Sequence, residues 1–481
     1  MATSLNGKSI VEIMKVHRGQ CLFSDDGLEL EYEDLVETIE EFGKQLSSID
    51  MEKNKICALV LPNGVDMAIS FLALANYVTV SPLNPNYTKE EFLFFLEDLD
   101  CEFIITDNNA SNSLLEAAKQ LKIKLFYLNN YSPKNRLSIK SLPTPSKCLI
   151  DQNKADDICL ILHTSGTTSR PKQVQLSCMN IISSALNIAR VLQLEKKDKG
   201  MNIMPLFHIH GLIASLLSSI VTGSSVVCTS GFNALTFYGN IKNFKPTWIT
   251  AVPTMYQAIL SRASRNKEII QASNLRLLRS SSAAMPVATI EALENAFQCP
   301  VIEAYGMTEA SHQMASNFLD SIRKPGSVGK SAGPEIALFR DNKLITVANT
   351  IGEIVIRGSN VTKGYKNNNK ANKENFFDGW FKTGDLGKFD EDGFLFISGR
   401  IKEIINKGGE KISPQEVDEA LMRHEAVFQA VSFSVKHEKL GEDIAAAVVL
   451  KDGATIDDKD LRTHLSKSIT TFKVPRQILI L

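Results

Sequence analysis

The feature that most restricts the fold of this chain is an alternation of short apolar runs with helix-period stretches. The run 56–61, for example, is followed by a helical pattern over 65–75, and a second apolar run, 77–80, comes next. Such alternation is typical of βαβ units, in which helices cover a mostly parallel sheet. Further strands are predicted at 103–106, 125–128, 158–162, 201–205, 225–228, 247–252, 275–279 and 301–305.

Helices are predicted between these strands. Thr88 begins one of them, because Glu91 stands three residues later and completes a capping box. The other helical patterns lie at 111–121, 179–192, 212–221, 254–263 and 287–297. This part of the chain therefore predicts an α/β fold with two βαβ-type sheets.

The pattern changes after Gly326, where short strands with glycine-rich turns indicate a small β unit. A last, α+β unit follows, in which Ser413 and Glu416 form a second capping box with Pro414 at the first helical position. Its elements are a helix over 417–423, strands at 427–435 and 444–450, and a helix over 457–468.

Composition excludes several classes of protein. Charged residues make up 22% of the 481 residues and the net charge is -1, so no global field attracts nucleic acid or an anionic membrane. The eight cysteines include no Cys-x-x-Cys pair, which predicts reduced, structural thiols without a zinc site or a disulfide framework. The longest apolar region, 212–227, is interrupted by polar residues and predicts no membrane span.

One predicted strand, 158–162, runs into a turn rich in hydroxyl groups. Backbone N–H groups, hydroxyls and a lysine ammonium in such a loop can converge on polyphosphate oxygens. A solvated loop without a ligand is the alternative. The turn contains Thr164, Ser165, Gly166, Thr167, Thr168 and Ser169 and closes on Arg170, Pro171 and Lys172.

Four other polar stretches follow predicted strands or lie in the β-rich part. They are 205–211, with His208 and His210; 279–282, with three serines; 305–309, with His312 just beyond; and 380–385. Ligands in open α/β sheets bind outside the carboxyl ends of the strands. We therefore expect these stretches and the hydroxyl-rich turn to share one site.

The order and content of these motifs resemble the acyl-adenylate-forming superfamily, which includes acyl-CoA synthetases, luciferases and peptide-synthetase adenylation domains. The resemblance spans essentially the whole chain and implies ATP, Mg²⁺ and coenzyme A as the ligands. It implies that Thr164, Ser165, Gly166, Thr167, Thr168 and Lys172 hold the β- and γ-phosphates of ATP. The ending Gly-Lys-Ser/Thr of a Walker A loop is missing.

The resemblance also assigns the remaining nucleotide contacts. Tyr305 is expected to stack on adenine with Gly306 allowing close approach, Thr308 to touch the α-phosphate and Glu309 to hold Mg²⁺, and Met307 is also expected among the nucleotide-binding residues. Asp385, assisted by Arg400, is expected to bind the ribose hydroxyls. The alternative for Asp385 is a simple turn residue after Gly384.

Chemistry in this family needs no protein nucleophile. A substrate carboxylate attacks ATP to give an acyl-adenylate and pyrophosphate, and CoA thiol then displaces AMP, so catalysis consists of positioning and charge stabilisation. His208, Thr308, Glu309 and Lys402 are the expected catalytic residues.

The second half-reaction in relatives uses a rotated C-terminal domain. The resemblance makes 400–402 the hinge between domains 1–399 and 403–481, and it makes Lys407, Gly408 and Gly409 a lining of the CoA channel. A solvated basic turn is the alternative for the lysines.

The hydroxyl-rich turn and the motifs around His208, Ser282 and His312 resemble the oxalate:CoA ligase branch. Two imidazoles and a hydroxyl in the acyl pocket suit a small dianion, since an apolar tail would leave their donors unpaired. The open alternatives are a coumarate or medium-chain fatty acid, with His208 as a gate and His312 on the surface. A metal pair of His208 and His210 is disfavoured, because no third ligand is near.

Relatives carry a catalytic lysine downstream of a Phe-Lys-Val-Pro segment, which here is 472–475, and the chain stops at Leu481. We therefore predict a truncated C-terminus. A nucleotide-binding protein with little catalysis is the alternative if the stop is natural. We predict a monomer without nucleic-acid partners in the cytoplasm, and a peroxisomal location stays open because its signal would follow Leu481.

Overall fold

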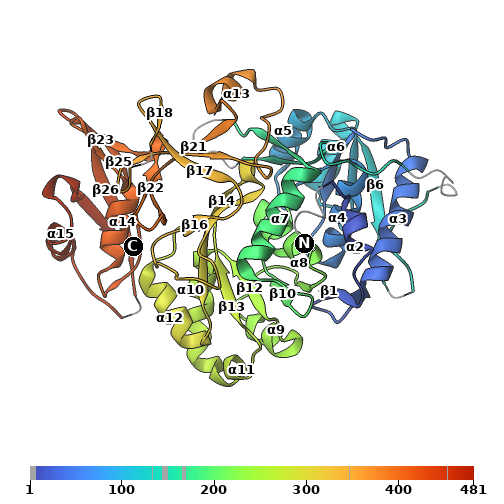
Figure 1. Ribbon diagram of the computed structural model, residues 1–481, viewed down its shortest axis with the longest axis horizontal. Coiled ribbons are helices and arrows are strands. Elements are labelled where there is room, and N and C mark those ends of the chain that lie inside the picture. The colour runs from blue at the N-terminus through green and yellow to red at the C-terminus, as the bar shows by residue number, and fades with distance from the viewer. Residues whose placement is uncertain (1–6, 133, 143–149, 165–169, 346, 452) are drawn as a thin grey trace.

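The computed structural model describes residues 7–132, 134–142, 150–164, 170–345, 347–451 and 453–481. Two large sheets with their helices form the body of the molecule, and the last part of the chain lies at one end of it (Figure 1). The predicted α/β class is confirmed.

The first large sheet has seven strands in the order β7-β6-β5-β3-β4-β8-β9, and the five central strands are parallel. The hairpin from β8 to β9 is antiparallel and carries the hydroxyl-rich turn. The strands are β3 Ile56–Val60, β4 Thr79–Pro82, β5 Phe103–Thr106, β6 Lys124–Asn129, β7 Ser138–Ile139, β8 Ile158–His163 and β9 Gln173–Ser177.

The second large sheet has nine strands in the order β16-β15-β14-β13-β12-β10-β11-β1-β2. Its central strands are parallel and its ends are antiparallel. The strands are β1 Gln20–Ser24, β2 Glu29–Glu31, β10 Lys199–Asn202, β11 Ser225–Cys228, β12 Trp248–Ala251, β13 Leu277–Ser280, β14 Val301–Met307, β15 His312–Ser316 and β16 Lys330–Ser331.

Helices cover both faces of each large sheet. Helix α4, Val65–Tyr77, is buried almost all round because it packs against strands of both sheets. The other helices here are α2 Ile10–Met14, α3 Tyr32–Ser48, α5 Lys89–Leu99, α6 Asn112–Leu121, α7 Cys178–Leu192, α8 Ser218–Ile220, α9 Phe237–Phe244, α10 Pro253–Ala263, α11 Lys267–Gln271 and α12 Val287–Phe297. A π-helix, η1 His210–Leu217, precedes α8.

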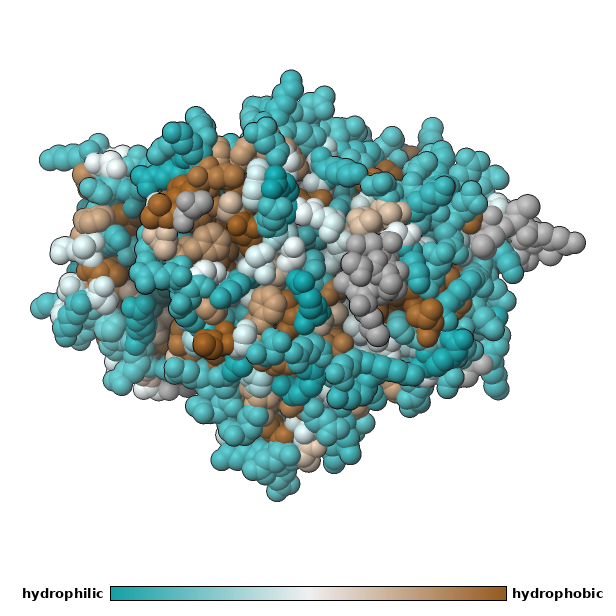
Figure 2. Space-filling model, in the orientation of Figure 1, coloured by the Kyte–Doolittle hydropathy of each residue, from teal (hydrophilic) through white to brown (hydrophobic). Residues whose placement is uncertain are grey.

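The predicted small β unit is a six-stranded sheet. It contains β17 Glu335–Arg340, β18 Lys343–Ile345, β19 Gly352–Arg357, β20 Phe376–Phe377, β21 Trp380–Phe389 and β22 Leu395–Arg400, with helix α13 Asn369–Asn375 beside it. Apolar side chains gather over this sheet on an otherwise mostly hydrophilic face (Figure 2), and Leu344, Val347 and Ile351 are among the exposed ones.

The C-terminal unit has its own five-stranded sheet and its own core. A short 3₁₀ turn, Ile401–Glu403, connects it to β22. Its elements are β23 Ile405–Lys407, β24 Glu410–Ile412, α14 Pro414–Met422, β25 Val427–His437, β26 Gly441–Leu450, α15 Asp458–Ser466 and β27 Gln477–Ile480.

One of the two predicted capping boxes forms. Thr88 and Glu91 exchange both bonds at the start of α5. Ser413 makes no side-chain cap bond, and the Glu416 carboxylate, the other half of the box, binds the ammonium of Lys473 at 2.6 and 2.7 Å instead. The second box was therefore a wrong prediction, in which a tertiary ion pair displaced a local bond.

Two further sequence predictions concern cysteines and membranes. The described cysteines, at 21, 57, 101, 159, 178, 228 and 299, are free and buried; Cys148 lies outside the described residues. Within the described ranges, no helix combines the length and the apolar character that a membrane crossing requires.

Candidate functional site

A cavity of about 500 Å³ brings the predicted motifs together at the ends of β8, β13 and β14 and along the first half of β21. We call it the polar cavity. Its lining includes Thr164, Lys172, His208, His210, Ser282, Gly306, Met307, Thr308, Glu309, His312, Asp385, Arg400 and Lys402. Segments that are far apart in the sequence therefore meet at one place, as the motif pattern predicted.

The hydroxyl-rich turn is described only at its two ends. Ser165, Gly166, Thr167 and Thr168 lie outside the described residues. Thr164 N–H donates to the carbonyl of Lys172 at 3.0 Å, and Lys172 N–H donates to Thr164 Oγ1 at 3.1 Å. These bonds close the hairpin directly at the base of the turn.

The carboxylate of Asp98, on α5, contacts both stems of this hairpin. Its oxygens lie 3.1 Å from His163 Nε2, 2.8 Å from Gln173 Nε2 and 3.3 Å from a guanidinium nitrogen of Arg170. Burial lowers the pKa of His163 despite this neighbour. Sequence reasoning missed Asp98, because no motif surrounds it.

Glu309 is buried at the cavity wall, and this burial raises the pKa of its carboxyl group. Tyr365, another residue that the motifs did not identify, donates from its hydroxyl to Glu309 Oε1 at 2.8 Å. The ammonium of Lys172 lies 4.6 Å from the centre of the Tyr365 ring. A buried carboxylate that forms no ion pair with any described residue fits a hard metal ion such as Mg²⁺, which prefers oxygen ligands.

Gly306 permits a close contact that no other residue allows. A Cβ atom there would lie 1.8 Å from the carbonyl oxygen of His312. The contact occurs where β14 and β15 shift register, so that Met307 pairs with His312. The glycine thus brings the imidazole of His312 to the cavity.

Asp385 and Arg400 face each other across β21 and β22. Arg400 Nε lies 3.0 Å from Asp385 Oδ1, so the guanidinium and this carboxylate form an ion pair at the cavity. The buried Tyr305 donates to the other carboxylate oxygen. Burial raises the pKa of Asp385, and Tyr305 and Arg400 oppose that effect. Stacking of Tyr305 on adenine stays a prediction.

His312 is fully buried at the acyl end of the cavity, so its interpretation as a surface residue was wrong. The His210 ring stacks on it with centroids 4.7 Å apart. His210 Nδ1 lies 3.0 Å from Ser282 Oγ, and Nε2 lies 2.6 Å from Thr250 Oγ1. Because both ring nitrogens of His210 are engaged, the metal pair with His208 is excluded as well.

His208 is solvent-accessible at the cavity, and its ring lies 4.6 Å from that of Phe207. Desolvation lowers its pKa, so the imidazole is neutral near pH 7. Within the described ranges, no group of three His, Cys, Asp or Glu residues is arranged to hold a metal ion.

Lys402 lines the polar cavity from the 3₁₀ turn. Lys407 lies in the C-terminal sheet, where its ammonium pairs with Asp443 at 2.6 Å and is largely buried. A solvated position for Lys407 is therefore wrong. Gly408 and Gly409 form the adjoining turn with φ of 61° and 99°, which favours glycine.

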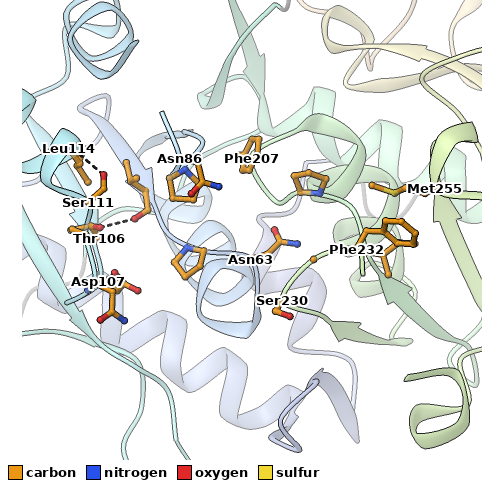
Figure 3. Close-up of a pocket in the computed structure, with 18 residues that line it drawn as sticks. Asn63, Asn86, Thr106, Asp107, Ser111, Leu114, Phe207, Ser230, Phe232 and Met255 are labelled. Carbon is orange, nitrogen blue, oxygen red and sulfur yellow. Dashed lines mark hydrogen bonds between the residues drawn. The ribbon is translucent and has the colours of Figure 1, made fainter. Parts of the chain in front are cut away.

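Figure 3 shows a second cavity, of about 750 Å³, which shares the lining residue Phe207 with the polar cavity. Its labelled side chains come from loops and helices that adjoin both large sheets, and Thr106 comes from the end of strand β5. We call it the amide-lined cavity, because Asn63, Asn86 and Asn109 are in its wall. Asp107 is the one charged residue among the described residues that line it.

Comparisons with known proteins agree with this arrangement. Residues 14–366 match the AMP-binding enzyme family, and residues 416–481 match the AMP-binding enzyme C-terminal domain. The oxalate–CoA ligase of Arabidopsis thaliana is 44% identical over 90% of this chain and 86% of that protein. The oxalate–CoA ligase of Saccharomyces cerevisiae is 39% identical over 88% and 82%. ATP-bound MatB from Rhodopseudomonas palustris superposes with a TM-score of 0.89 at 26% identity, covering 98% of this chain and 95% of MatB.

Proposed function

Since the chain belongs to the AMP-binding enzyme family and is an AMP-forming acid–CoA ligase, we propose that it converts oxalate, ATP and coenzyme A into oxalyl-CoA, AMP and pyrophosphate. The observation that carries the choice of acid is the polar acyl end of the cavity, with His208, Ser282 and His312. Similarity to two oxalate–CoA ligases supports it.

The polar acyl end favours a small dianion for a physical reason. A hydroxyl or imidazole that faces an apolar tail loses its hydrogen bonds to water, and each such loss costs about 1–3 kcal/mol. The two carboxylates of oxalate offer acceptors to all of these groups. Coumarate and medium-chain fatty acids do not.

The other end of the cavity suits the nucleotide. We propose that Thr164, Lys172 and the turn between them hold the β- and γ-phosphates, and that Asp385 with Arg400 binds the ribose, next to Tyr305, Gly306 and Met307. Glu309 would hold Mg²⁺, which supplies positive charge to the phosphates when bound. Thr308, beside Glu309, would contact the α-phosphate.

Two displacements follow from this placement. An oxygen of oxalate attacks the α-phosphorus, and the bond to pyrophosphate breaks as the acyl-adenylate forms. The CoA sulfur, after its proton passes to water, then attacks the acyl carbon, and AMP leaves with the electrons of the C–O bond. The neutral imidazole of His208 lies at this end of the cavity. It would contact the reacting groups there without placing a charge near the incoming CoA thiol.

The amide-lined cavity is our candidate route for the pantetheine arm of CoA. This arm is an uncharged chain with two amide groups, and asparagine side chains pair with amides through both a donor and an acceptor. We further propose residues 400–402 as the hinge between domains 1–399 and 403–481, with Lys407, Gly408 and Gly409 reaching the CoA channel after rotation. A monomeric state and a cytoplasmic or peroxisomal location stay predictions.

The test is the release of AMP and pyrophosphate by purified protein with oxalate, malonate, coumarate and octanoate as separate substrates. We expect oxalate to give the highest kcat/KM. If coumarate or octanoate outperformed oxalate, the choice of acid would be overturned, although the ligase class would stand.

A further inference from the structure

A fully buried arginine lies directly behind the acyl end of the polar cavity. Arg279, on β13, donates to Thr250 Oγ1 and His312 Nε2, each at 3.2 Å, and to Gln313 Oε1 at 3.1 Å. Burial lowers the pKa of its guanidinium to about 10, so it stays charged near pH 7. No carboxylate in the described part of the chain forms an ion pair with it. Its positive charge is therefore uncompensated.

The arginine fixes the direction of one chain of hydrogen bonds. Thr250 Oγ1 accepts from Arg279, so its single hydrogen is free for its other neighbour, His210 Nε2 at 2.6 Å. Desolvation holds the pKa of His210 well below its ordinary value, so the ring is neutral and its one proton sits on Nδ1. Nδ1 then donates to Ser282 Oγ at 3.0 Å, which leaves the serine hydrogen for the cavity.

The arginine fixes the second imidazole in the same sense. His312 Nε2 accepts from Arg279, and burial also holds the pKa of His312 well below its ordinary value. Its proton therefore sits on Nδ1. Ser282 and His312 therefore each keep a hydrogen-bond donor that is free to bind a ligand.

Backbone strain independently marks the same two residues. Ser282 has φ of 73° and His312 has φ of 96°, a region that side chains other than glycine rarely adopt. Such conformations are strained, and they cluster at active sites and ligand-binding positions, where the surroundings hold the residue in place. Both side chains line the polar cavity.

We propose that Arg279 is a positioning residue. It makes the acyl end of the polar cavity, at Ser282 and His312, a positively charged surface of hydrogen-bond donors. Such a surface matches the distal carboxylate of a dianionic acid. The inference rests on the proposed function and deepens it, because it names the group that selects for the second charge. Arg279 itself need not touch the substrate. A purely structural role, through the bond from Gln313 Nε2 to the Ala332 carbonyl, predicts loss of stability without loss of selectivity.

The kinetic test compares oxalate with oxamate, which has the same shape but an uncharged amide in place of one carboxylate. For Arg279→Met, the ratio of kcat/KM for oxalate to that for oxamate should fall by about tenfold or more, because the buried positive charge behind the acyl end and the hydrogen-bond directions that it sets are lost. Arg279→Lys keeps the charge and should keep most of the ratio. KM for ATP should not change in either variant.

Thr250→Val provides a second variant that leaves the arginine in place. It removes only the hydroxyl between Arg279 and His210, so the His210 proton is no longer directed to Nδ1 and the oxalate to oxamate ratio should also fall. Histidine ¹⁵N spectra of the wild type should report the Nδ1–H form for both His210 and His312, assigned with the single His→Gln variants.

These measurements separate the two proposals. If the wild type fails to activate oxalate, the proposed function is lost, while the ¹⁵N spectra of the wild type and of Thr250→Val still decide the role of Arg279. Nε2–H forms in the wild type, or an unchanged ratio in both Arg279→Met and Thr250→Val, would overturn the inference about Arg279.

Discussion

At the residue scale, Glu303 on β14 is a buried carboxyl without a cationic partner in the described structure. It accepts one bond, from Gly326 N–H at 3.1 Å, and desolvation raises its pKa to about 8. The folded protein therefore holds a proton there that the unfolded chain, with a pKa near 4.5, releases earlier. The free energy of unfolding must fall as pH rises from about 4.5 to about 8 and level off above that.

Replacing Glu303 by Gln keeps an oxygen acceptor for Gly326 and removes the charge. We expect Glu303→Gln to be more stable than the wild type by about 2–4 kcal/mol at pH 8.5 and nearly equal to it at pH 5. Urea unfolding at both pH values measures this difference. The same change at Glu291, exposed on helix α12, is the control for the substitution itself, and a gain at Glu303 that did not depend on pH would contradict the linkage.

Much of the polar cavity was predictable from the sequence at this scale, and its supporting residues were not. Thr164, Ser282 and Asp385 stand in recognisable motifs at strand ends, and the cavity contains all three. Asp98 and Tyr365 act on the site through a hydrogen bond or a charge from distant segments. A single sequence carries no pattern for such contacts, because they depend on the tertiary packing.

At the scale of elements, Asp98 ties helix α5 to both stems of the hairpin β8–β9. Hydrogen bonds to a charged group are each worth about 1.5–3 kcal/mol, so its loss loosens the stems that frame the proposed phosphate site. We expect Asp98→Asn to raise KM for ATP by about three- to tenfold, with little change in KM for oxalate. Steady-state kinetics with each substrate varied in turn measures both constants.

Asp100→Asn is a matched control on the same helix. Asp100 is the C-cap in the left-handed conformation, with φ of 55°, which asparagine adopts readily. It should leave KM for ATP unchanged. Equal values for the two variants would mean that the Asp98 contacts do not support the site.

The π-helix η1 is a second element that places the site. It begins at His210, and π-helical turns occur frequently at functional sites. Its second residue, Gly211, lies so close to the preceding loop that a Cβ atom would be 2.3 Å from the carbonyl oxygen of Pro205. The sequence predicted a helix over 212–221 but not this contact, because hydrophobic periodicity does not report backbone approach.

Gly211→Ala should therefore force the helix from the loop and lower the free energy of unfolding by about 1–3 kcal/mol. Gly239→Ala, in helix α9, is the control, since a Cβ atom there meets nothing within 4 Å. That control should be stabilising by up to about 1 kcal/mol. Urea unfolding measures the change in stability of each variant. Equal changes in Gly211→Ala and Gly239→Ala would show that the backbone at Pro205 moves readily to accommodate the added Cβ atom.

At the scale of the whole molecule, one short connection joins the C-terminal unit covalently to the rest, and helix α14 packs against β22. Ile401–Glu403 is one 3₁₀ turn, and beyond it the C-terminal sheet has a separate core. In this arrangement Lys402 lines the polar cavity, whereas Lys407 is paired with Asp443 inside the C-terminal sheet. Any entry of 407–409 into the CoA route requires this unit to rotate about the connection.

Lys402→Pro tests that rotation directly. Proline is tolerated in the first turn of a helix, so the arrangement described here survives, but it fixes φ near -65° and removes the freedom that a hinge needs. We expect adenylate formation, measured as oxalate-dependent pyrophosphate release, to be largely retained. Thioester formation, measured as oxalyl-CoA, should fall by more than about tenfold.

Lys402→Ala removes the same side chain from the cavity wall and keeps the backbone free, so any loss of activity that it shares with Lys402→Pro is due to the missing lysine side chain. An equal loss of both half-reactions in Lys402→Pro, beyond that of Lys402→Ala, would exclude a hinge at this residue.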